Sequence, residues 1–132
     1  MKQTTIKNSI TVSGVGLHTG AVVNLTFSPA PVNHWYKFQR TDLEGQPIIE
    51  ADCELVVDTS RGTTLEKNGA RVNTVEHALA ALVGLELDNV LLEIDGPEMP
   101  IMDGSSKPFV DALLSVGIVE QDAEREYFHI GR

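Results

Sequence analysis

The chain has 132 residues, of which 42% are apolar and 22% are charged, and these proportions are typical of one folded domain with its own core. Its 19 acidic and 10 basic side chains give a net charge of −9, which excludes a nucleic-acid-binding role that rests on a basic face. Cys53 is the single cysteine, which excludes a disulfide framework and an all-cysteine metal site and favours a cytoplasmic location. No run approaches the roughly 18 apolar residues of a membrane span.

The first half of the chain is predicted to form short β-strands, because apolar and polar residues alternate between turn residues. The glycine-rich segment between the first two strands, residues 14–20, is predicted to be a hairpin loop with Leu17 and His18 at its tip. The spacing of the glycines in this segment also fits a plain glycine-rich turn whose histidine is solvated. A small hairpin is predicted to turn at Asn68-Gly69. The predicted strands cover residues 4–12, 23–27 and 35–40, with one or two more within 48–57.

Two helices of about ten residues are predicted in the second half. Asn73 lies three residues before Glu76, which is the spacing of a capping box, and the Ala/Leu-rich run that follows favours a helix ending near Gly84. A buried strand is predicted over residues 89–94. Ser105 or Ser106 is predicted to cap a second helix, which carries Pro108 in its first turn and stops at Gly117.

After the second helix, a short strand is predicted at Ile118-Val119, followed by an acidic connector over residues 120–126 and a new strand at residues 127–130. A strand that begins at the end of the given sequence has nothing after it to pair with, which indicates that the chain is cut there. The fold class is predicted to be α+β, a two-layer sandwich with two helices on one face of a mostly antiparallel or mixed sheet, plus a small β insert.

The adjacent residues Glu76 and His77 fall in the first turn of the first predicted helix. Exposed backbone N–H groups and the positive end of the helix dipole there favour a carboxylate and disfavour an imidazolium. A neutral imidazole can bind a metal, and a nearby carboxylate can act as a general base. The pair is a weak motif by itself, because helix N-termini recruit acids and surface histidines are common. The sequence contains no HExxH motif, and His18, His34 and His129 are scattered, so this chain supplies at most part of a metal site.

Four segments occur in one order along nearly the whole chain, and together they resemble the N-terminal domain of UDP-3-O-acyl-N-acetylglucosamine deacetylase, the zinc amidase of lipid A synthesis in Gram-negative bacteria. The segments are Gly14-Val15-Gly16-Leu17-His18-Thr19-Gly20, Thr41-Asp42, Thr74-Val75-Glu76-His77-Ala78-Leu79-Ala80-Ala81-Leu82 and Pro100-Ile101-Met102-Asp103-Gly104-Ser105.

The resemblance implies the first half of a duplicated two-domain fold with the active site between the halves. The N-terminal deacetylase domain is then expected over residues 1–126, and the truncated start of the second domain over residues 127–132. His77 matches a zinc ligand, Glu76 matches the general base, and Leu17 and His18 match the loop near the substrate, UDP-3-O-acyl-N-acetylglucosamine. The other two zinc ligands, in an HxxxD arrangement, are expected from the second half. Residues 59–63 correspond to a further loop beside the metal, although Arg61 and Gly62 stand where the family often has apolar side chains.

The resemblance therefore predicts the N-terminal half of a zinc-dependent deacetylase that is inactive as an isolated domain. From composition and charge, neither a membrane span nor a nucleic-acid partner is expected. Some members of the family are fused to a 3-hydroxyacyl-carrier-protein dehydratase, and these residues leave that question open. The alternative is a non-catalytic binding or scaffold domain that keeps the fold and presents its acidic C-terminal half to another protein.

Overall fold

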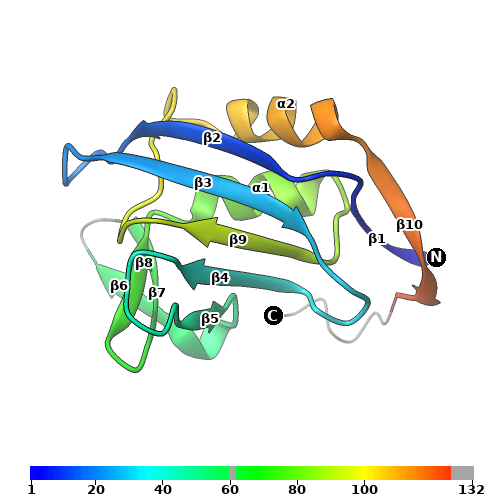
Figure 1. Ribbon diagram of the computed structural model, residues 1–132, viewed down its shortest axis with the longest axis horizontal. Helices are drawn as coiled ribbons and strands as arrows, with labels where there is room; N and C mark the ends of the chain where they lie inside the picture. Colours follow the sequence, from blue (N-terminus) through cyan, green and yellow to red (C-terminus); the bar gives the residue numbers. More distant parts are fainter. Residues whose placement is uncertain (60–61, 126–132) are drawn as a thin grey trace.

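The computed structural model describes residues 1–59 and 62–125 (Figure 1). Its main sheet has five strands in the order β2-β3-β9-β4-β5. Neighbouring strands are antiparallel except β4 and β9, which are parallel, so the predicted mixed sheet is confirmed. The strands are β2 (Ile10–Val15), β3 (Val22–Pro29), β4 (Tyr36–Arg40), β5 (Ile48–Glu50) and β9 (Val90–Ile94).

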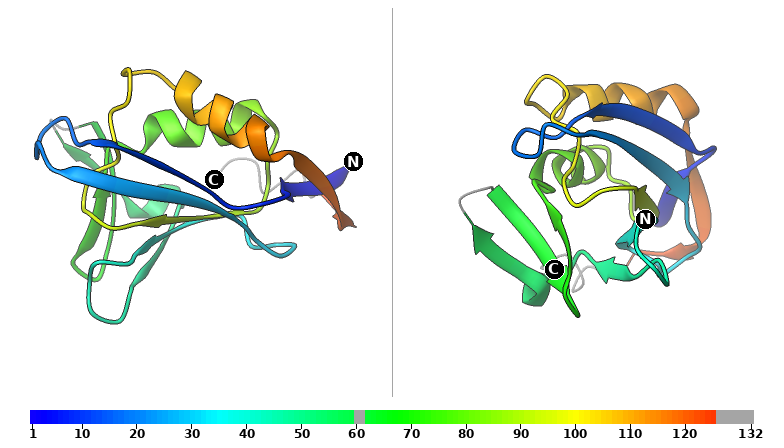
Figure 2. Two further views of the ribbon diagram at one scale, coloured as in Figure 1. Left: turned by 45° about the horizontal axis from the view of Figure 1, so that its top comes forward. Right: turned by 60° about the vertical axis from the view of Figure 1, so that its left-hand side comes forward.

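Two helices, α1 (Glu76–Gly84) and α2 (Lys107–Val116), lie on the same side of this sheet, as Figure 2 shows. The core fills the space between the two layers, and the rings of Phe27 in β3 and Phe109 in α2 meet edge to face with their centroids 6.0 Å apart. The predicted two-layer α+β architecture is therefore confirmed. Fully buried side chains from both layers include Leu25, Phe27, Phe38, Leu92, Ile94, Leu82, Phe109 and Leu113.

The predicted small β insert is a three-stranded sheet of β6 (Val56–Thr59), β7 (Gly62–Lys67) and β8 (Ala70–Asn73), preceded by the 3₁₀ turn η1 (Cys53–Leu55). Asn68 and Gly69 form the tight turn between β7 and β8, and both have positive φ, 53° and 84°. The predicted hairpin is therefore confirmed. Arg40 in β4 joins the insert to the main sheet, because its Nη1 donates to the carbonyl of Arg71 at 2.7 Å.

A separate two-stranded ribbon pairs the N-terminal strand β1 (Lys2–Ile6) with β10 (Ile118–Glu124). The prediction of one strand over residues 4–12 is wrong, because residues 7–9 break it and β1 pairs with β10 whereas β2 pairs with β3. The predicted acidic connector is also wrong over residues 120–124. Acidic side chains there occupy the exposed positions of an alternating strand, and an antiparallel strand accepts acids on its solvated face. The strand predicted over residues 127–130 lies outside the described residues.

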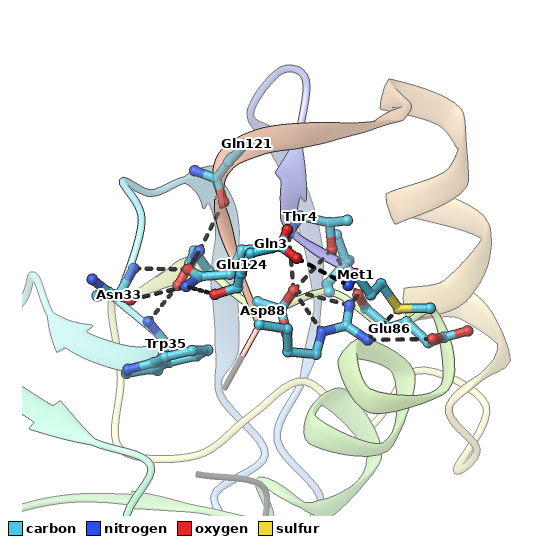
Figure 3. Close-up of polar contacts among 12 residues, drawn as sticks. Met1, Gln3, Thr4, Asn33, Trp35, Glu86, Asp88, Gln121 and Glu124 are labelled. Carbon is cyan, nitrogen blue, oxygen red and sulfur yellow. Dashed lines mark hydrogen bonds and ion pairs between the residues drawn. The ribbon is translucent and has the colours of Figure 1, made fainter. Parts of the chain in front are cut away.

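Asn89, which is fully buried just before β9, holds the ribbon to the main sheet (Figure 3). Its Nδ2 donates to Oε1 of Gln3 in β1 at 2.9 Å and to Oε1 of Gln121 in β10 at 2.7 Å. Its Oδ1 accepts the backbone N–H of Trp35 at 2.8 Å. One amide side chain therefore ties together both strands of the ribbon and the loop that leads into β4.

The far side of the same junction carries an ion pair. Nε and Nη2 of Arg125 donate to Oδ2 of Asp88 at 3.2 and 3.0 Å, and that oxygen also accepts the N–H of Thr4 at 2.8 Å (Figure 3). Both charged side chains are 12% exposed.

Within the described residues, no helix is long and apolar enough to cross a membrane.

Candidate functional site

Glu76 and His77 are the first two residues of α1, so their predicted place in the first turn is confirmed. The predicted N-cap is wrong. Val75 occupies the cap position with helical dihedrals and makes no side-chain cap bond, whereas Oδ1 of buried Asn73 accepts the hydroxyl of Thr64 at 2.9 Å. Asn73 is the last residue of β8, and its amide stabilises the insert instead of the helix. Asn73 therefore has the sequence spacing of a capping box, but its side chain bonds within the β insert and does not cap the helix.

Thr74, between β8 and α1, turns the chain from strand to helix with a φ of 63°. Its side chain is 7% exposed. A left-handed conformation is rare for a β-branched residue, and such backbone strain persists only where the surrounding structure holds it in place. Strain of this kind clusters at functional sites, and here it lies two residues before Glu76.

The carboxylate of half-buried Glu76 lies against the start of β7. Its Oε1 accepts the backbone N–H of Thr63 at 3.1 Å, and the Thr63 carbonyl accepts the N–H of Val75 at 3.2 Å. Gly62 approaches even more closely, because a Cβ placed on it would lie 2.8 Å from Oε2 of Glu76. The β insert therefore forms one wall of the candidate site, and the absence of a side chain at Gly62 makes room for the carboxylate.

Leu17 and His18 lie in the turn between β2 and β3, so the predicted hairpin loop is confirmed. Both are exposed, Leu17 to 61%. Gly16 closes the loop by donating its N–H to the carbonyl of Ala21 and accepting the N–H of Gly20, each at 3.0 Å. The turn, β8 and the start of α1 lie at the same end of the molecule, the left-hand end in Figure 1.

Glu98 connects the hairpin loop to the start of α1, and the sequence analysis did not single it out. Its carboxylate is buried and accepts the backbone N–H groups of His18 and Thr19 at 3.0–3.1 Å. The residues on either side of it, Pro97 and Met99, bond to the backbone of Asn73 at 2.8 and 3.1 Å. A lone glutamate in a Gly-Pro-Glu segment has no spacing signal, so its role could be found only from the fold.

Of the scattered histidines, His18 belongs to the loop at this site, whereas His34 lies away from it. His34 belongs to the loop between β3 and β4, at the opposite end of the sheet from the β2–β3 turn (Figure 1). Its Nδ1 is 2.9 Å from the carbonyl oxygen of Trp35, and burial lowers the pKa of its imidazole. His129 lies outside the described residues.

Among the side chains that the structure describes, the histidines, aspartates and glutamates include no group of three that could hold a metal ion. A catalytic zinc site normally has three protein ligands. His77 can supply one nitrogen ligand from the first turn of α1, so a complete site requires groups from outside the described part of the chain. The imidazole nitrogen of His77 is a type of ligand that zinc binds, but one such ligand is fewer than the three of a catalytic zinc site.

Three features meet at this end of the domain, and together they make up the candidate site. It presents a carboxylate held by a backbone N–H, an imidazole beside it, and an exposed loop fastened to the same junction. Fold and site together define a two-layer α+β domain that presents a carboxylate and an imidazole, a candidate metal ligand, on consecutive residues at the start of one helix.

The chain belongs to the UDP-3-O-acyl N-acetylglycosamine deacetylase family, whose sequence profile matches residues 3–132. It is 52% identical over 131 residues to the UDP-3-O-acyl-N-acetylglucosamine deacetylase of Xanthomonas oryzae pv. oryzae, with 98% of this chain and 43% of that protein covered. It is also 52% identical over 130 residues to the bifunctional enzyme LpxC/FabZ of Bacteroides thetaiotaomicron, with 98% of this chain and 28% of that protein covered.

A third relative, the bifunctional enzyme LpxC/FabZ of Chlorobaculum tepidum, is 52% identical over 128 residues, which cover 97% of this chain and 27% of that protein. The chain thus spans less than half the length of these curated relatives. The resemblance seen in the four sequence segments is confirmed at the level of the family.

Proposed function

We propose that this chain is the first half of a zinc-dependent deacetylase that removes the N-acetyl group of UDP-3-O-acyl-N-acetylglucosamine, in the cytoplasm, as the committed step of lipid A synthesis. The observation that carries the proposal is the position of Glu76 and His77, side by side at the start of α1 in a chain of this family. The names of relatives at about 50% identity support the reaction and the substrate.

Glu76 is the proposed general base. A base must be held at hydrogen-bonding distance from the water that it deprotonates, and the N–H of Thr63 fixes one oxygen of this carboxylate in place. The side chain is half-buried, so it is partly shielded from solvent while it remains reachable from the site. In this role it accepts the proton of the water that attacks the acetamide carbonyl.

His77 is the proposed ligand of the zinc ion from this chain. When bound, zinc acts as a Lewis acid that polarises the scissile carbonyl and stabilises developing negative charge. The imidazole follows directly after the base on α1, so one short segment of backbone sets the positions of both groups. The remaining ligands, a histidine and an aspartate of an HxxxD pattern, are expected in the second half of the longer protein.

Leu17 and His18 are the proposed substrate contacts, since their loop is exposed and is connected through Glu98 to the junction before α1. The second half is proposed to pack on the helix layer. That layer presents large apolar side chains to solvent, Val83 of α1 at 64% exposure and Leu114 of α2 at 54%. Covering them would exclude water from apolar surface. The active site would then lie between the two halves.

The test is acetate release from UDP-3-O-acyl-N-acetylglucosamine by the zinc-loaded longer protein that contains this chain. We expect turnover that is lost on chelation and restored by zinc, and no turnover by the 132-residue chain alone. Turnover by the isolated chain would contradict the division of the metal site between two halves. A longer protein that binds the substrate without hydrolysing it would instead support the non-catalytic scaffold.

A further inference from the structure

Glu98 is a buried carboxylate whose hydrogen bonds go to backbone N–H groups of an exposed loop. It is 2% exposed. Its Oε1 accepts the N–H of His18 at 3.1 Å and that of Thr19 at 3.0 Å, and its Oε2 lies 3.1 Å from the same His18 nitrogen. A single side chain therefore holds the backbone at the tip of the β2–β3 turn.

The loop is shaped to receive this carboxylate. A Cβ placed on Gly16 would lie 2.5 Å from Oε1 of Glu98 and 2.6 Å from Oγ1 of Thr19. Any larger residue at position 16 would therefore push the loop away from the Glu98 carboxylate. Gly14 makes a second close approach, with a Cβ position 3.0 Å from both Cβ of Pro100 and Sδ of Met102. Gly16 in the loop and Gly14 near the end of β2 therefore both allow close contact with the segment that contains Glu98.

The same segment is fastened to the strand that leads into α1. The N–H of Asn73 donates to the carbonyl of Pro97 at 2.8 Å, and the N–H of Met99 donates to the carbonyl of Asn73 at 3.1 Å. A third bond runs from the N–H of Ile101 to the carbonyl of Val15 at 3.0 Å. Glu98 thus stands between the hairpin loop on one side and the last residue of β8 on the other, three residues before Glu76.

We propose that Glu98 is a positioning residue that holds the loop of Leu17 and His18 in a fixed orientation relative to Glu76 and His77. This inference rests on the proposed function. A glycine-rich exposed loop has high conformational freedom, and a loop that must be ordered on binding weakens the affinity for its ligand. Removing the carboxylate frees the loop, so substrate binding is weakened while the base and the metal ligand stay in place.

The proposal is tested in the zinc-loaded longer protein with Glu98→Gln, which keeps the size of the side chain but removes its negative charge and puts a donor in place of Oε2, 3.1 Å from the His18 nitrogen. We expect hydrogen exchange at the amides of His18 and Thr19 to accelerate at least about tenfold. KM for UDP-3-O-acyl-N-acetylglucosamine should rise about tenfold, the effect of losing roughly one net hydrogen bond, with kcat within about threefold and unchanged zinc content. Glu44→Gln, an exposed glutamate in the turn after β4, is the matched control.

A role limited to stability would lower the melting temperature and the active fraction without raising KM. Unchanged KM in Glu98→Gln, or a loss confined to kcat, would therefore overturn the proposal. If that variant does not fold, Gly16→Ala separates the loop from the carboxylate while keeping Glu98, and wild-type KM in that variant would overturn it as well. A wild-type protein without deacetylase activity would overturn the proposed function and this inference together, whereas normal wild-type turnover with unaffected variants overturns the inference alone.

Discussion

The backbone N–H of Thr63 donates a hydrogen bond to Oε1 of Glu76 at 3.1 Å. The beginning of β7 therefore fixes the position of the carboxylate at the start of α1. The carbonyl of the same threonine accepts the N–H of Val75. The β insert is therefore part of the candidate site, and changes in it are expected to reach the proposed base.

A side chain at position 62 should disturb this contact. Gly62→Ala places a Cβ 2.8 Å from Oε2 of Glu76, so the carboxylate must move. We expect kcat of the longer protein to fall about tenfold or more, with zinc content unchanged, because displacement of a base by about 1 Å has costs of this order. Steady-state kinetics and metal analysis measure both quantities.

Gly69→Ala is the matched control for that variant. Gly62 and Gly69 both have positive φ, 92° and 84°, so alanine strains the backbone at both positions. A Cβ at Gly69 meets no atom within 4 Å, so this variant carries the strain without the contact to Glu76. Equal activity in the two variants would show that crowding of Glu76 has no effect.

Loss of the imidazole at position 77 should lower the metal content of the longer protein. His77→Ala removes the ligand proposed from this chain, and a site reduced from three protein ligands to two binds zinc more weakly. Zinc per protein, measured after dialysis against a weak chelator, should fall well below one. His34→Ala, at the opposite end of the sheet, should retain zinc, and full zinc content in His77→Ala would remove His77 from the metal site.

The amide of Asn89 should be among the polar groups most important for stability. Asn89→Ala removes the donor to Oε1 of buried Gln3 and to Oε1 of partly buried Gln121, and the loss of these hydrogen bonds together with a cavity costs about 3 kcal/mol. Denaturant unfolding should show that loss. The exposed Asn8→Ala should stay within about 0.5 kcal/mol of wild type, and a similarly small effect at Asn89 would contradict the described network.

Asp42 should contribute to the dependence of stability on pH. Hydrogen bonds from the Arg40 guanidinium lower the pKa of the Asp42 carboxyl below its ordinary value. A depressed pKa stabilises the folded state above the ordinary pKa of the carboxyl, and this contribution is lost as the pH falls through the folded-state pKa. Between pH 7 and about pH 3, the free energy of unfolding should therefore fall less in Asp42→Asn than in wild type. Glu44→Gln controls for the removal of one acid, and an unchanged pH dependence in Asp42→Asn would contradict this role.

Local patterns predicted the elements whose signals are local. The turn at Asn68-Gly69 follows from the preference of both residues for positive φ, and the stop at Gly117 follows from its φ of 86°. The two helices were found within two residues of their ends, because apolar spacing and Pro108 mark them. Because the start of the first helix is marked by such local signals, the sequence also predicts that Glu76 and His77 share its first turn.

Local patterns gave wrong or missing predictions where a residue pairs with a segment that is distant in the sequence. Residues 120–124 have the charge of a connector, yet they pair with β1, more than a hundred residues away. Asn73 has the spacing of a cap, yet its side chain binds Thr64 within the insert. Glu98 meets the hairpin loop across 80 residues of chain. None of these contacts leaves a periodicity or spacing that a single sequence reveals.

The most direct test of the account is the rate of acetate release by the longer protein with Glu76→Gln and a full complement of zinc. Gln keeps the shape of the side chain and can still accept the N–H of Thr63, but it cannot take a proton from water. We predict a kcat lower than wild type by a factor of about 10²–10⁴ with zinc still bound. Wild-type turnover in that zinc-loaded variant would contradict the assignment of Glu76 as the base.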